Sequence, residues 1–318
     1  MKNLAVAVPL LLCLTPACAF DDDLLEGEHD DIGDLDREGR VVNGRVINGR
    51  LINGRLINGT TFNGVVASVS LDHVLVGGTY QNLVTLAGGK FTKNTTTGTG
   101  FNGAIFDATL STGQIVPLKI TSVRQAAADL WAYKLSYQTD TGWVTYCRDA
   151  AGAEVEAYAL NGVWSLAEGV AGGGNRTAVT NKFTFACRVT GALGKCVDFG
   201  YVPWRTVGGT TLLSYHDTCV RAVRADWCGD GKAWTVDGTT INLYDRKLVQ
   251  TDTDTWSPEA EWSPNGAVCL NTTRVTNGEL RGELIPTCAK SRQLSDCGAR
   301  GLTSSNSASL HVTERYFP

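Results

Sequence analysis

Apolar residues in the first half of the chain come in short runs, which predict strands rather than long helices. Between residues 65 and 125 the runs are separated by Gly, Thr and Asn turns, and they read VVASVSL, HVLVGG, NLVTLAGG, NGAIFDATL and IVPLKITSV. This spacing is typical of a meander of short strands. Residues 130–147 predict a hairpin, because large apolar residues occupy alternate positions on both sides of the turn Thr139-Asp140-Thr141-Gly142.

The pattern changes after residue 181. KFTFACRV predicts a strand, GALGKCVDFGY a short helix, and TINLYD and AVCLN two further strands. A helix of about three turns is expected in TLLSYHDTCVRAVRADW, ended by the glycines of residues 228–231. The residues whose spacing predicts it are Leu212, His216, Cys219, Val220 and Val223. The last 45 residues are expected to be loop-rich. We therefore predict a mainly β fold with a few short helices, with α+β as the alternative.

The N-terminus has the pattern of a signal peptide, predicted at residues 1–19. Lys2 precedes the apolar run Leu4–Leu14, and Ala17-Cys18-Ala19 is a small-x-small cleavage site. We expect cleavage between Ala19 and Phe20. A competing interpretation makes the chain a lipoprotein with lipid attached to Cys18. The apolar run is too short to remain as a membrane span, and no later run reaches the required length.

Two unusual segments follow the signal peptide. Residues 20–38 carry ten acids and one base, which predicts a disordered acidic leader. Residues 39–64 repeat Asn-Gly every five residues, and two interpretations remain open: coil-like turns with strand pairing, or a flexible connector. Residues 39–318 carry 26 Lys and Arg against 22 Asp and Glu. This small positive excess argues against nucleic-acid binding.

Eight cysteines remain in the predicted mature chain after Cys13 and Cys18 are set aside. They are Cys147, Cys187, Cys196, Cys219, Cys228, Cys269, Cys288 and Cys297. An even number behind a secretion signal predicts disulfides formed in an oxidising compartment. The equal spacings allow a nested arrangement, 187 with 228 and 196 with 219, which we prefer. Local pairing, 187 with 196 and 219 with 228, is equally allowed.

The densest group of reactive side chains lies in HDTCVRAVRADWCGDG. His216 with Asp217 or Asp226, or with a thiolate at Cys196 or Cys219, is the alternative catalytic set. Our preferred interpretation contains no catalytic residue, because eight cysteines favour disulfides and a histidine on a helix face commonly packs in the core.

The same stretch suggests two metal sites, but neither has the spacing of a known site, so we expect no metal and no cofactor. Zinc would use His216, Cys219 and Cys228, but the spacing lacks a second Cys-x-x-Cys pair. The carboxylates in the calcium hypothesis are Asp226, Asp230 and Asp237. Their spacing is not that of an EF-hand loop, and Asp beside Gly commonly forms turns.

Several blocks in order resemble the bacterial ADYC-domain family. They are FTFACRVTGALGKCVDFGYVPW, YHDTCVRAVRADWCGDG, TVDGTTINLYD and EAEWSPNGAVCL, within about residues 130–275. The motif that names the family is here Ala225-Asp226-Trp227-Cys228, so Trp227 replaces Tyr, which puts any role of a phenolic hydroxyl in doubt. The resemblance implies a secreted or surface bacterial protein and implies no activity.

These observations lead to one preferred function and one alternative. We expect a Gly/Thr-rich β region at residues 65–125 and a Cys-rich, ADYC-like domain stapled by disulfides at 126–318. The preferred function is a non-catalytic binding or structural module, either secreted, periplasmic or on the outer cell surface, with an unknown extracellular partner. Membrane attachment is expected only if Cys18 is lipidated. The alternative is a secreted hydrolase or transferase that uses His216 with a nearby Asp or Cys.

Overall fold

The computed structural model describes residues 40–42, 52–55, 61–236, 238–274, 279–280, 283–284, 294, 296–297 and 308–315. All of them belong to one structural unit, Ile32–Pro318. The predicted signal peptide, the acidic leader and most of the Asn-Gly repeat lie outside the described residues. Among the described helices, none has the length and apolar character needed to cross a membrane.

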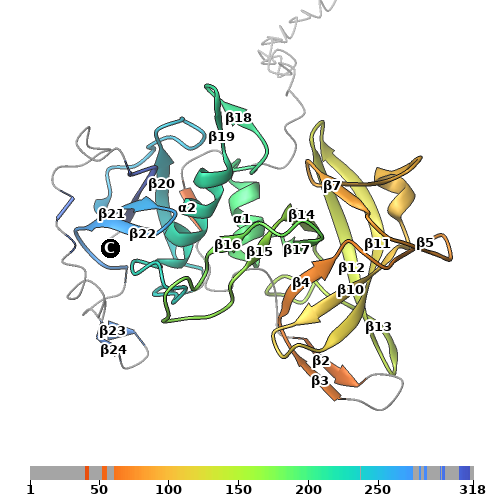
Figure 1. The fold of residues 1–318 in the computed structure, drawn as a ribbon. Helices are drawn as coiled ribbons and strands as arrows, with labels where there is room; N and C mark the ends of the chain where they lie inside the picture. The colour runs from red at the N-terminus through yellow and green to blue at the C-terminus, as the bar shows by residue number, and fades with distance from the viewer. Residues whose placement is uncertain are drawn as a thin grey trace, which may run out of the picture. The chain divides into compact units, whose positions relative to one another are not determined.

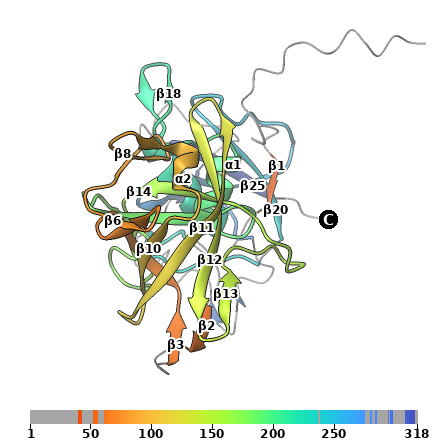
Figure 2. The same cartoon turned by 90° about the vertical axis from the view of Figure 1, so that its right-hand side faces the viewer.

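Six antiparallel strands close into a barrel (Figures 1 and 2). Around the barrel they are β4 (Val66–Ser70), β10 (Ile105–Leu110), β11 (Ile115–Ala127), β12 (Leu130–Thr139), β14 (Ala157–Asn161) and β17 (Lys182–Cys187). The ring closes because β17 pairs with β4, which places Phe183 opposite Val69. The register of the β11–β12 pair shifts between Ile120 and Ser122 and again further along, and such irregularities bend long strands as closure requires.

Aromatic side chains fill the barrel interior. Phe91 lies among them, with ring centroids 5.0 Å from Phe106, 5.1 Å from Phe183 and 5.2 Å from Tyr133. All four side chains are fully buried. Phe91 comes from outside the barrel strands, and the other three point inward from them. The barrel therefore has a solid core.

Strand β11 runs across the boundary that we predicted between residues 125 and 126. The division of the chain at that point stays a prediction.

Short hairpins extend the barrel and the loops around it. The strands that prolong the barrel sheet are β5 (Val74–Val76), β6 (Thr79–Gln81) and β13 (Gly142–Thr145). The separate small sheets are β2 (Ile52–Arg55) with β3 (Thr61–Gly64), β7 (Thr85–Ala87) with β8 (Lys90–Lys93) and β9 (Thr96–Thr97), β15 (Val163–Trp164) with β16 (Arg176–Thr177), β18 (Thr206–Val207) with β19 (Thr210–Thr211), and β23 (Glu279–Leu280) with β24 (Glu283–Leu284). A 3-10 helix occupies Gly98–Phe101.

Two α-helices, α1 (Ala192–Asp198) and α2 (Leu213–Arg224), share a second core with the outer wall of β14 and β17 and with a five-stranded sheet (Figure 1). The strands of that sheet, in order, are β1 (Arg40–Val42), β20 (Thr240–Asp245), β25 (His311–Arg315), β21 (Ser257–Ser263) and β22 (Gly266–Leu270). Trp227, Trp234 and Trp262 are buried in this core. The fold class is mainly β, as predicted.

Three disulfides lie within the described residues. They confirm one of the two pairings in the nested arrangement and contradict the other. Cys196 bonds to Cys219 and joins α1 to α2, as the nested arrangement predicts. The predicted pairing of Cys187 with Cys228 is wrong, because Cys187 bonds to Cys147. The reason is that β17, which ends at Cys187, lies in the barrel wall close to the hairpin that Cys147 follows, and Cys228 belongs to another layer. The third disulfide joins Cys269 to Cys297.

One local prediction also needs correction, and one segment contains a strand that was not predicted. Helix α2 ends at Arg224, before the predicted glycines, because Ala225 adopts the left-handed conformation with φ 53°. The last 45 residues include a regular strand, β25, which lies between β20 and β21. Its residues His311–Arg315 are all buried although several are polar, so strand alternation is absent from the sequence.

Candidate functional site

The ADYC motif begins where α2 ends. The last turns of α2 carry Arg221 and Arg224, three residues apart and therefore on one side of the helix. Both guanidinium groups are buried, with 2% and 1% of their side-chain surface exposed. The left-handed Ala225 then reverses the chain, which brings the Asp226 carboxylate back beside both arginines.

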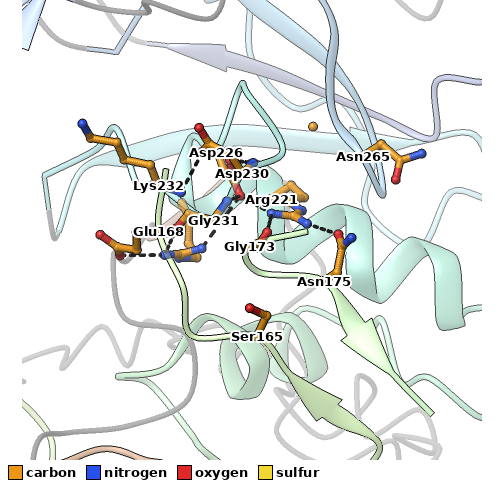
Figure 3. Close-up of polar contacts among 12 residues, drawn as sticks. Ser165, Glu168, Gly173, Asn175, Arg221, Asp226, Asp230, Gly231, Lys232 and Asn265 are labelled. Carbon is orange, nitrogen blue, oxygen red and sulfur yellow. Dashed lines mark hydrogen bonds and ion pairs between the residues drawn. The ribbon is translucent and has the colours of Figure 1, made fainter. Parts of the chain in front are cut away.

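Asp226 is completely buried and is surrounded by donors (Figure 3). Its Oδ2 forms a close ion pair with Arg221 Nη1 and lies 3.9 Å from Arg224 Nη1. The backbone N–H of Asp230 donates to Oδ1 at 3.1 Å, and that of Gly231 donates to Oδ2 at 3.0 Å. The carboxylate thus pairs with Arg221, lies close to Arg224 and fixes the loop that follows it.

The two arginines extend this arrangement to other segments. Arg221 donates to the carbonyl of Gly173 at 2.8 Å, to the carbonyl of Pro264 at 3.1 Å and to Asn175 Oδ1. Arg224 donates to the carbonyl of Gly231 at 2.6 Å and to Glu168 Oε1 at 3.2 Å. We call Asp226, Arg221, Arg224 and the groups that they bind the Asp226 network. It joins the motif to the Gly-rich loop 167–175 and to the turn at 264–266.

Two glycines make this close packing of loops sterically feasible. A Cβ atom at Gly173 would lie 2.0 Å from the carbonyl oxygen of Asp230, and one at Gly231 would lie 2.2 Å from that of Ala167. Gly231 also has φ +83°, which side chains rarely adopt. These two glycines therefore let the backbones of the two loops come into contact.

Burial and charge act in opposite directions in the network. Burial raises the pKa of the Asp226 carboxyl, and the nearby Arg221 and Arg224 oppose that effect. Burial likewise lowers the pKa of the Arg224 guanidinium, and Asp226 opposes it. Because the carboxylate accepts from two backbone N–H groups and two guanidinium groups surround it, the environment matches its charged form. Removal of one charge would leave the others buried without compensation.

The three residues of the alternative catalytic set do not converge on one cleft. His216 is fully buried, with Nε2 3.0 Å from the carbonyl of Leu193 and its ring against Trp164. Asp226 is equally buried in the network. Only Asp217 reaches a cavity, where its Oδ2 lies 3.4 Å from Arg176 Nε. Of the two described cavities, the first is lined by Asp217, and neither His216 nor Asp226 lines either one.

The thiol and metal hypotheses meet similar obstacles. Cys196 and Cys219 are bonded to each other and Cys228 is disulfide-bonded, so none of the three supplies a thiolate. Of the calcium carboxylates, Asp226 is paired with arginine, and Asp237 lies outside the described residues. Within the part of the chain that the structure describes, no group of three or more His, Cys, Asp and Glu side chains could hold a metal ion.

A polar cavity of about 210 Å³ adjoins the network, and Arg221 forms part of its wall. The residues that line it are Gly174, Asn175, Arg176, Asp217, Arg221, Pro264 and Asn265. They come from the Gly-rich loop, from Arg176 at the start of β16, from α2 and from the turn before β22. The Asp226 network joins the Gly-rich loop, α2 and the turn, and so holds three of the four segments that form the cavity wall.

The sequence identified Asp226 but did not assign a role to the arginines. Arg221 and Arg224 belong to the same stretch as Asp226, yet charged residues on a helix are usually exposed. A usable signal was present: two arginines three residues apart at the end of the helix, with Asp226 two residues beyond the second. The role of Gly173 depends on contact with a distant segment, for which the sequence gives no sign.

Comparison with known proteins agrees with the motif. The profile of the ADYC domain family matches residues 98–276, more than half of the chain, and so includes Asp226, both arginines and the Gly-rich loop. No curated protein matches the chain, and no solved structure does so either.

Proposed function

This chain belongs to the ADYC domain family, and we propose that it is a secreted or cell-surface bacterial module with a non-catalytic binding role. In this proposal the family motif maintains structure. Asp226 holds the Gly-rich loop and the turn at 264–266 against α2, and the cavity between them is the surface that meets a partner.

The observation that carries the proposal is the complete burial of Asp226 with donors on both oxygens. A catalytic carboxylate needs access to the substrate, directly or through one water. Here the nearest charged groups are arginines that are themselves buried and bound to backbone carbonyls. The arrangement is typical of a structural ion network, whose hydrogen bonds and ion pairs hold three chain segments together.

An extracytoplasmic location is supported by the cysteines and by the N-terminal pattern. Three disulfides join described residues, and Cys228 is bonded as well. Such bonds persist in oxidising compartments and are rare in the cytosol. The signal-peptide pattern at residues 1–19 leads to the same compartment, with cleavage between Ala19 and Phe20.

The proposal can be tested by expression of the chain with its own N-terminus in a bacterium, followed by fractionation, intact mass and thiol titration under denaturing conditions. We expect an extracytoplasmic protein that begins at Phe20, or one lipidated at Cys18, with all its cysteines blocked. A cytoplasmic protein with free thiols would overturn the location. A hydrolase activity that Asp217→Asn abolishes without a change in melting temperature would overturn the non-catalytic role.

A further inference from the structure

Arg176 lines two neighbouring cavities, and the pair has the character of a ligand site. The first cavity, of about 210 Å³, is the one beside the Asp226 network. The second has about 250 Å³ and is lined by Asn161, Gly162, Arg176, Ala178, Val179 and Thr180. Each is large enough for a single sugar ring. Together they offer a charged centre at Arg176 with uncharged polar groups beyond it.

The first cavity presents N–H donors that the protein does not use. The only described contact of the Arg176 guanidinium is the 3.4 Å contact from Nε to Asp217, which leaves the terminal Nη groups available. Arg221 uses four of its five N–H groups in described hydrogen bonds, so one N–H on Nη2 remains. Two guanidinium groups on one wall favour a carboxylate, which arginine binds through paired hydrogen bonds.

Asp217 adds an acceptor to the same cavity. Its Oδ1 is buried below the surface, 3.8 Å from His216 Nδ1, so a ligand in the cavity would meet the carboxylate at Oδ2. The described contact of Oδ2 is the 3.4 Å one with Arg176 Nε, and a hydroxyl group of a ligand would supply a further donor there.

From these groups we infer that the two cavities around Arg176 bind a carboxylated saccharide, of the uronic acid type. The carboxylate would lie against Arg176 and the remaining N–H of Arg221, and an adjacent hydroxyl would donate to Asp217. In the second cavity the amide of Asn161 and the hydroxyl of Thr180 suit further ring hydroxyls. This inference rests on the proposed binding role, for which it names the ligand class and the site.

The test is an NMR titration of the ¹⁵N-labelled, disulfide-intact protein with D-glucuronate, and with D-glucose and acetate as matched probes. We expect glucuronate to shift amide signals of residues that line the two cavities. We expect glucose and acetate to bind at least tenfold more weakly, because each lacks half of the recognised groups. Arg176→Gln should weaken glucuronate binding roughly tenfold or more, the usual worth of a charge-assisted hydrogen bond.

Lys119→Gln is the matched control variant, since it removes the same charge from the barrel wall, where Lys119 lies over Trp143. It should bind glucuronate as the unmodified protein does. Asp217→Asn, a change of similar volume, should weaken glucuronate binding and leave acetate binding unchanged, so the test does not depend on one variant. The inference is overturned by equal binding of glucuronate and glucose, by equal losses in Arg176→Gln and Lys119→Gln, or by shifts outside the cavities. If glucuronate does not bind but the cysteines are blocked and the chain is exported, this inference fails alone and the proposed function stands.

Discussion

Replacement of Asp226 by Asn should destabilise the protein severely. The side chain keeps its size, but the amide removes the charge that compensates the buried Arg221 and Arg224. It also replaces one acceptor oxygen with a donor, although both oxygens accept a backbone N–H in the native protein. Loss of one partner of a buried ion pair costs about 3 to 5 kcal/mol in the free energy of unfolding. The lower end already exceeds the effect of most substitutions.

The matched control is Asp149→Asn. Asp149 also accepts a backbone N–H, from Ala153 at 2.8 Å, but in an exposed loop without a buried arginine. We expect it to cost less than about 1 kcal/mol. The assay is urea unfolding at pH 7 with disulfides intact, followed by tryptophan fluorescence, which reports on the core because Trp227 and Trp234 pack there. If Asp226→Asn costs no more than Asp149→Asn, the structural account of the motif is refuted.

Three further predictions concern packing, pH and covalent links. Gly231→Ala should lower the free energy of unfolding in urea by about 1 to 3 kcal/mol more than Gly209→Ala does. Both glycines have positive φ, but only at Gly231 would a Cβ meet a carbonyl oxygen. Equal losses in the two variants would contradict this prediction. Burial lowers the pKa of His311 to about 3 from its ordinary 6.5, so the folded state binds this proton less readily than the unfolded state does. The contribution of His311 to the free energy of unfolding should therefore be fully present above pH 6.5 and fall by about 1.4 kcal/mol per pH unit towards pH 3. A pH series of unfolding measurements should show that His311→Phe lacks this fall, and parallel profiles of the two proteins would contradict the prediction. Joint replacement of Cys147 and Cys187 by Ala should lower the free energy of unfolding by about 4 kcal/mol, because the disulfide closes a loop of 40 residues and so restricts the unfolded chain. A loss below about 1 kcal/mol would contradict this prediction.

Local pattern was enough to predict several elements of the fold. The hairpin at residues 130–147, the strand TINLYD and the short helix around Cys196 all appear, because alternation, turn residues and helical spacing are local properties. Closure of the barrel could not be predicted in this way. It depends on the pairing of β4 with β17, whose strands are more than a hundred residues apart in the chain. Strand β25 was missed because its buried polar residues follow no apolar alternation.

The candidate site was only partly predictable for a related reason. Asp226 and Asp217 were singled out, since carboxylates beside a histidine suggest chemistry. Their actual roles depend on which distant groups meet them. Arg221 becomes part of a structural network only because the Gly-rich loop and the turn at 264–266 fold against it. The incorrect pairing of Cys187 has the same origin, because sequence spacing does not show which wall of the fold a cysteine occupies.

The central claim is that Asp226 and Arg221 act together to hold the fold, and a double-mutant cycle tests it most directly. The free energy of unfolding would be measured for the unmodified protein, Asp226→Asn, Arg221→Gln and the double variant. Because the two side chains are in direct contact, we predict a coupling energy of at least about 1.5 kcal/mol, with the double variant less destabilised than the two single losses added together. Additive effects within about 0.5 kcal/mol would contradict the claim.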